Sequence, residues 1–134
     1  MSIHSDFMGL LRAGVTGGNY RVYDGQVTDV LDVGATYPYI QVTAIPVASQ
    51  ERSLARSVSA QSHLWRVTPA ALTQTALLTA AQRVRDALEG ARLGGHLVQE
   101  IPNNIGVMTN EKLVIEKKFV HFTKLEFQVM APNR

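Results

Sequence analysis

Hydrophobic and polar side chains alternate along residues 39–47, which predicts a β-strand with one buried face. The apolar parity consists of Ile40, Val42 and Ala44. The other parity, which we expect to stay open to a partner, consists of Tyr39, Gln41 and Thr43. A second β-prone run at residues 20–23 precedes this strand. Tyr37-Pro38 launches the strand, because proline favours an extended conformation in the residue before it.

Similar patterns predict three further strands, at residues 62–68, 96–101 and 113–130. Trp65, the only tryptophan, falls on the parity of the first of these strands that we expect to be buried. The last run exceeds the ordinary length of a strand. We therefore expect a break or bulge near residues 116–118.

Two amphipathic helices are predicted. The longer spans residues 69–89, with Thr68 as its cap, Pro69 at its first position and Gly90 as its stop. Its apolar stripe consists of Leu77, Ala81, Val84 and Leu88. A short helix near the N-terminus carries a stripe of its own and ends at residues 14–19. That stripe consists of Ile3, Phe7, Leu10 and Leu11.

Together these elements predict an α+β fold in one domain, residues 1–134. We expect a mostly antiparallel sheet of four to five strands, with both helices packed on one face. Two long loops, residues 48–61 and 102–111, complete the picture. Long loops in a compact domain are uncommon unless they are functional or order on binding.

Both loops are candidate arms that contact another subunit or partner. Arg52 and Arg56 are spaced four residues apart in the first loop, so they would share one face of a helix. The second loop carries Ile105, Val107 and Met108 without periodic support, as expected of a segment that buries itself only against a neighbour. A merely solvated loop is the alternative for residues 48–61.

Composition narrows the class of protein. Hydrophobic residues make up 46% of the 134 residues, and the net charge is +2 with no basic block. Cysteine is absent, which excludes disulfides and thiolate metal sites. No apolar run approaches the about 20 residues of a membrane span. We therefore expect a soluble protein made in the cytoplasm, with no membrane partner.

No residue pattern predicts a catalytic, metal or cofactor site. The glycine fingerprint of dinucleotide sites, the Gly-x-Ser-x-Gly elbow and paired histidine motifs are all missing. Asp24, Asp29 and Asp32 lack the order of a calcium loop and are read as a solvated acidic patch. An enzyme with a site assembled from His63, His121 and these aspartates is the alternative, and it predicts bound metal.

Several segments along the chain form a recognisable order. They are "VYDG" at 22–25, an acidic loop, "YPYIQV" at 37–42, a long polar loop and "LWRV" at 64–67. A helix ending in "ALEG" at 87–90 and a final strand near the C-terminus follow them. This order resembles the tail-completion or tail-terminator family of long-tailed bacteriophages, and the resemblance covers most of the chain.

The resemblance implies a structural virion protein, not an enzyme. Members form a six-membered ring on the head-proximal end of the tail tube, stop tube polymerisation and present the surface that joins the head connector. The implied partners are further copies of the chain, the tail tube protein and the head-tail connector protein, with DNA only as passing cargo. The acidic loop with Asp24, Asp29 and Asp32 would face the lumen through which the DNA slides. Assembly would take place in the host cytoplasm.

Two other functions remain open from the sequence. A head-side connector or neck protein belongs to the same assembly class. A small nucleic-acid-binding module is suggested by the sequence pI near 9.2 and by the run Tyr20-Arg21-Val22-Tyr23, which places aromatic rings around a basic residue.

Overall fold

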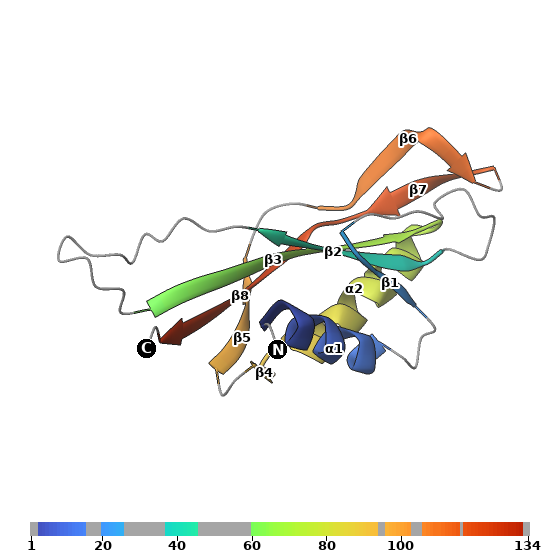
Figure 1. The fold of residues 1–134 in the computed structure, drawn as a ribbon. Helices are drawn as coiled ribbons and strands as arrows, with labels where there is room; N and C mark the ends of the chain where they lie inside the picture. The colour runs from blue at the N-terminus through green and yellow to red at the C-terminus, as the bar shows by residue number, and fades with distance from the viewer. Residues whose placement is uncertain are drawn as a thin grey trace, which may run out of the picture.

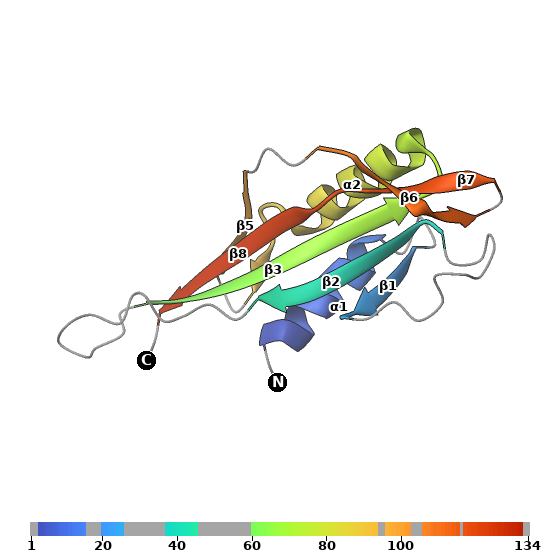
Figure 2. The same ribbon diagram turned by 90° about the horizontal axis from the view of Figure 1, so that it is seen from above.

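The computed structural model describes residues 3–15, 20–25, 37–45, 60–93, 96–102, 106–115 and 117–132. In chain order they form α1 (Ile3–Val15), β1 (Arg21–Asp24), β2 (Tyr39–Ile45), β3 (Ala60–Ala71), α2 (Gln74–Leu88), β4 (Arg92–Leu93), β5 (His96–Ile101), β6 (Met108–Ile115), β7 (Lys118–Phe122) and β8 (Leu125–Pro132). Both helices lie on the same side of the sheet (Figure 1), and β2, β3 and β8 run side by side along its length (Figure 2).

The sheet has eight strands in the described part of the chain, so the predicted fold with four to five strands is wrong. Its order is β1-β2-β3-β8-β5-β4, and the hairpin β6–β7 joins the end of β3 through β7. The sheet is mixed, because β1 and β2 are parallel while the other pairs are antiparallel. The prediction counted too few strands for two reasons. The run at 113–130 is divided among β6, β7 and β8, and β4 has only two residues.

The main hydrophobic core lies between the helices and the apolar parity of the sheet. Ile40 and Val42 of β2 are fully buried in it, as the alternation predicts, whereas Ala44 near the strand end is exposed. Phe7 of α1 stacks on Trp65 of β3, with ring centroids 4.1 Å apart and ring planes 6° apart. Stacked aromatic rings bury a large apolar area, so this pair ties α1 to the centre of the sheet.

Strand β3 passes through the residues where the sequence predicts the start of the long helix. Pro69 lies inside the strand, at a point where β3 changes neighbours. Pairing with β8 stops at Val67 and pairing with β7 starts at Ala70. Proline has no backbone N–H to donate. It is tolerated at position 69 because the hydrogen-bond ladder is interrupted on the side of β3 that faces β8 and β7. The Pro69 carbonyl still accepts a hydrogen bond from the Thr123 N–H at 3.3 Å.

Helix α2 therefore begins at Gln74, five residues later than the pattern suggests. Thr73 is its cap, and the Thr73 hydroxyl accepts a hydrogen bond from the Ala76 N–H at 3.1 Å. The predicted stop at Gly90 is confirmed. The helix ends at Leu88, and Gly90 has a φ of 78°, a conformation that favours glycine.

The two helices touch where each presents a small residue. A Cβ atom added to Gly14 of α1 would collide with the Cβ of Ala87 of α2 and lie 3.0 Å from the Ala87 Cα. A Cβ added to Gly9, on the same helix, would meet nothing within 4 Å. The close approach of the helices thus depends on Gly14 and not on a general need for glycine in α1.

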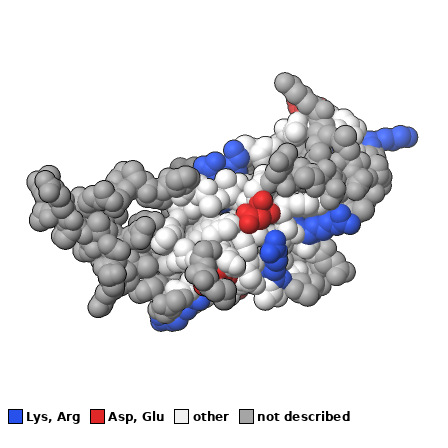
Figure 3. Space-filling view, in the orientation of Figure 1, with Lys and Arg blue, Asp and Glu red and all other residues white. Residues whose placement is uncertain are grey.

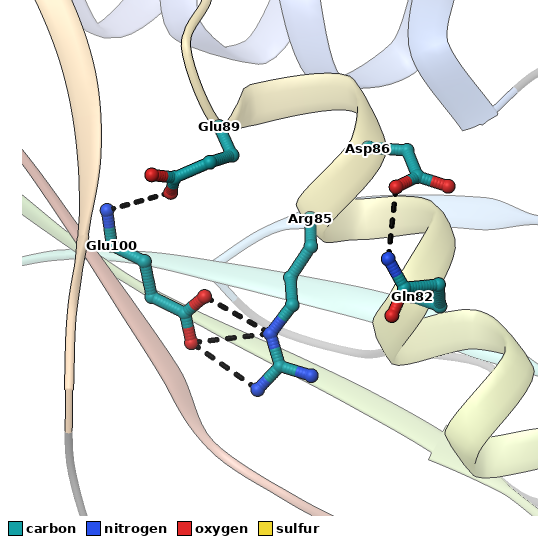
Figure 4. A network of polar contacts seen from close by, with 5 residues as sticks. All are labelled: Gln82, Arg85, Asp86, Glu89 and Glu100. Atoms are coloured by element: carbon teal, nitrogen blue, oxygen red, sulfur yellow. Dashed lines mark hydrogen bonds and ion pairs between the residues drawn. The ribbon is translucent and has the colours of Figure 1, made fainter.

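Polar contacts join α2 to the neighbouring strand β5 (Figure 4). The Arg85 guanidinium donates to both carboxylate oxygens of Glu100, with N–O distances of 3.0 to 3.2 Å. The Glu100 backbone N–H donates to the Glu89 carboxylate at 3.0 Å. These contacts attach the end of α2 to the side of the sheet.

The hairpin β6–β7 lies on the side of the sheet opposite the helices (Figure 1), where it covers a second, smaller core. The buried members of this core are Tyr37, Ala70, Ile115 and Val120. Residues 108–111, predicted as part of an arm, instead belong to strand β6, with Met108 opposite Phe122. The chain reverses at Lys117, which has a φ of 66°, so the break expected near residues 116–118 is a complete turn.

Candidate functional site

The open face of the sheet carries a groove of about 360 Å³ beside the hairpin β6–β7. Its floor is the polar parity of two adjacent strands, which the strand alternation places on the face opposite the helices. The floor residues are Tyr39, Gln41 and Thr43 of β2 with Arg66 and Thr68 of β3. Gln41 lies opposite Thr68 and Thr43 opposite Arg66, so the floor is two rows of cross-strand pairs. Three predicted partner-binding residues, those of β2, thus lie together in one concavity.

The wall of the groove comes from the hairpin and the chain that follows it. Its residues are Asn110 of β6, Val120 and Phe122 of β7, and Lys124. Arg66 and Thr68 share the parity that made the β2 residues candidates, so the sequence pattern contained the signal for them. The wall residues had no such signal, because only the folding of the hairpin over the sheet brings them to β2.

Arg66 is held in place within the groove. Its Nη2 atom lies 3.0 Å from a carboxylate oxygen of Glu126 on β8, and its Nε atom lies 3.4 Å from the same oxygen. The Arg66 side chain remains 39% exposed, so the guanidinium keeps donors available to a second group. At the far side of the floor, the Gln41 amide donates to the Gly25 carbonyl. The fixed groups of the groove are thus hydrogen-bond donors, the Arg66 guanidinium and the Gln41 amide.

A cluster of three tyrosines includes Tyr39, which lines the groove. The Tyr39 ring meets Tyr23 edge-on at 5.9 Å and Tyr37 at 5.3 Å between centroids. Burial, and then the neighbouring Tyr39, raise the pKa of Tyr37 to about 12. Burial, and then Tyr23, also raise the pKa of Tyr39. Both phenols are therefore neutral at physiological pH, and Tyr39 lines the groove as a residue that can donate and accept a hydrogen bond.

A polar chain not predicted from the sequence links α1, β1 and β3. The Trp65 Nε1–H donates to His4 Nδ1 at 3.0 Å, and His4 Nε2 lies 2.9 and 3.0 Å from the two Asp24 carboxylate oxygens. Because indole can only donate, Nδ1 must be the acceptor, and Nε2 carries the proton that bonds to Asp24. These hydrogen bonds satisfy the N–H of a nearly buried indole and connect α1 to β1 and β3 beside the core.

These hydrogen bonds include one residue of the predicted acidic patch, Asp24. Asp24 lies at the end of β1 and contacts His4, while its side chain remains 52% exposed. Asp29 and Asp32 lie outside the described residues, as do Arg52, Arg56 and Ile105. Val107 and Met108 are partly buried, and Met108 is the first residue of β6.

The alternative sites are not assembled within the described residues. His121 is opposite Ala71, and His63 lies eight residues earlier on β3, which separates the two by roughly 26 Å at the rise of a strand. His121 Nδ1 instead lies 3.0 Å from the Thr109 hydroxyl. Across the described part of the chain, no group of three metal-ligating side chains occurs.

The tyrosines of the run at 20–23 do not form an open stacking surface. Tyr20 is half-buried beneath the guanidinium of Arg83, which lies 5.9 Å from the ring centroid, and Tyr23 packs against Tyr39. On the face shown in Figure 3, lysine and arginine side chains are scattered among uncharged residues, with acidic side chains between some of them. Neither described helix is long and apolar enough to cross a membrane.

Comparison with known proteins adds information on the fold alone. No protein-family model matches the chain, and no curated protein matches its sequence. A solved structure whose name states no function is similar with a TM-score of 0.54 and 14% sequence identity, over 96% of each chain. A crystal structure of a protein from Akkermansia muciniphila has a TM-score of 0.42 and 10% identity, over 97% of this chain and 75% of that one. The first shows a shared fold, and the second is too distant to support an argument.

Proposed function

We propose that the protein is a structural virion protein, a tail terminator of a long-tailed bacteriophage. In this proposal, copies of the chain form a hexameric ring on the head-proximal end of the tail tube. The ring ends tube polymerisation and provides the surface for the head-tail connector protein, and DNA passes through it as cargo. The proposal begins from the sequence resemblance described above.

The observation that carries the proposal is the open groove beside the hairpin β6–β7. The segments that resemble the family, at 22–25, 37–42 and 64–67, belong to or adjoin β1, β2 and β3, three neighbouring strands. Two of these strands supply the floor of the groove. A concave surface with a polar, partly aromatic floor is suited to the side chains of another protein. We therefore assign the groove to the tail tube protein.

The test is an assembly reaction of the purified protein with tail-tube subunits of the same phage, followed by electron microscopy. The proposal expects six-fold rings about as wide as the tube, and tubes that stop growing once a ring is bound. A protein that neither forms rings nor changes tube length would overturn it. Rings that bind isolated head connector but never the tube would identify a neck protein instead.

A pair of variants separates the groove from a general effect of added charge. Thr43→Arg places a long cation in the groove, whereas Ala13→Arg places the same side chain on an exposed position of α1, on the other side of the sheet. We expect Thr43→Arg to weaken tube binding at least tenfold and Ala13→Arg to leave it unchanged. Equal binding by both variants would remove the groove from the proposal.

A further inference from the structure

Exposed large apolar side chains in the described residues are few, and three of them form two separate spots. Val114 of β6 and Phe119 of β7 are direct cross-strand partners near the tip of the hairpin, with exposures of 54% and 43%. Leu78 of α2 is 56% exposed on the side of the helix that faces away from the sheet. Adjacent exposed apolar side chains, such as the Val114–Phe119 pair, are typical of contact surfaces.

The surroundings of the two spots differ in shape and charge. At the hairpin tip, Lys117 and Lys118 are exposed beside the apolar pair. Leu78 lies in a shallow hollow along α2, whose other described lining residues are Thr75, Thr79, Gln82, Arg83 and Asp86. The tip thus presents an apolar pair edged with cations, and the hollow holds one leucine among polar side chains, with one guanidinium and one carboxylate.

Neighbouring side chains within the hollow orient its charges. Gln82 donates a hydrogen bond to the Asp86 carboxylate at 2.9 Å, one turn along the helix (Figure 4). The guanidinium of Arg83, the cation in the same hollow, lies over the Tyr20 ring. The hydrogen bond from Gln82 thus orients the Asp86 carboxylate, which lies roughly 12 Å from Leu78 along the helix by helical rise. An incoming lysine is its natural partner.

We propose that the hairpin tip of one copy of the chain docks on the outer face of α2 of the next copy. This inference rests on the ring of the proposed function, and it names the contact that builds the ring. Phe119 and Val114 would cover Leu78, and Lys117 or Lys118 would meet Asp86. An exposed apolar residue and a carboxylate on α2, and an apolar pair and two lysines at the tip of the same chain, favour a second copy as the occupant.

The positions of the two surfaces favour a head-to-tail contact. The hairpin lies on one side of the sheet and α2 on the other (Figure 1). Each copy therefore uses one surface toward one neighbour and the opposite surface toward the next. Such heterologous contacts generate a ring when the rotation closes and a filament when it does not.

The test uses two variants, each of which blocks one of the two surfaces. Phe119→Lys blocks the tip and Leu78→Lys blocks the hollow, and both side chains are exposed, so the fold is expected to persist. Leu97→Lys is the matched control, because Leu97 is 43% exposed on β5 and belongs to neither surface. Thermal unfolding confirms that each variant is folded, and analytical ultracentrifugation measures its assembly.

We expect wild type and the Leu97→Lys variant to form rings, and each blocked variant to remain monomeric. An equimolar mixture of the two blocked variants should stop at dimers, because one intact tip and one intact hollow remain between them. Mixtures that stay monomeric or grow beyond dimers would overturn the head-to-tail contact. Rings that survive both substitutions would overturn this interface and leave the proposed function standing. A wild type that forms no rings, alone or with tail-tube subunits, and leaves tube length unchanged refutes both.

A charge exchange provides an independent check of the ionic part. Lys118→Glu and Asp86→Lys should each weaken ring formation about tenfold, and the double variant should recover most of the loss. A double variant no better than the single variants would show that these two side chains do not meet.

Discussion

The contact of α1 with α2 through Gly14 makes opposite predictions for two glycines of the same helix. Gly14→Ala adds a methyl group that collides with the Cβ of Ala87 and lies 3.0 Å from the Ala87 Cα. Carbon atoms pack best at about 3.5 to 4.0 Å, so the helices must separate by roughly 1 Å or more. Separation in turn loosens Phe7 and Leu11, which are fully buried on α1.

Two opposing effects determine the size of the change. Overpacking a tight contact costs about 1 to 3 kcal/mol. Replacing glycine by alanine within a helix returns about 1 kcal/mol. We therefore expect Gly14→Ala to lower the free energy of unfolding by up to about 2 kcal/mol, which corresponds to a melting temperature lower by up to about 7 °C for a domain of this size.

Gly9→Ala is the matched control. The added methyl group meets nothing within 4 Å, so only the helix propensity acts, and the variant should be more stable by about 0.5 to 1 kcal/mol. Urea unfolding followed by Trp65 fluorescence measures both variants, because Trp65 lies in the core against α1. Changes of the same sign in both variants would refute the close helix contact as the reason for Gly14.

Two further predictions concern the start of α2 and the tyrosine cluster. Thr73→Ala removes the helix cap and should lower the free energy of unfolding, measured in urea, by about 1 kcal/mol. Thr75 is exposed in the first turn of the same helix, so Thr75→Ala should leave the stability unchanged or raise it slightly. Equal costs would mean that Thr73 is not the cap. The raised pKa of Tyr37, about 12, means that the unfolded chain loses this proton first, near pH 10. The contribution of Tyr37 to the free energy of unfolding should therefore be fully present below about pH 10. It should fall by roughly 2 to 3 kcal/mol as the pH rises to about 12. Tyr37→Phe should flatten this fall, and an unchanged alkaline profile would contradict the assignment.

Both parts of the proposed assembly depend on the same hairpin. The wall of the groove and the tip that meets α2 belong to β6, β7 and the residues beside them. The register of this hairpin shifts between Asn110 and Val114, which are in the same strand. Such a shift re-aims the side chains beyond it. It separates Asn110, which lines the groove, from the Val114–Phe119 pair at the tip.

Local patterns in the sequence determined the elements whose signals are short-range. The alternation in β2 correctly predicted a buried parity with Ile40 and Val42, and an open parity that lines the groove. Gly90 was predicted as the helix stop because positive φ is a local property of glycine. Strand β5 has the predicted bounds, residues 96–101.

The tertiary structure decided the features that depend on which strands are neighbours. Thr68-Pro69 has the local chemistry of a helix start, yet Pro69 lies in strand β3. The strand can hold a proline there because pairing changes from β8 to β7 at this point, so no backbone N–H of residue 69 is needed for the ladder. The residues of the groove wall and the opposition of the hairpin tip to α2 follow from pairings between segments far apart in the chain. A sequence pattern specifies which side chains share a face, but the partner across that face is set by packing of the whole sheet.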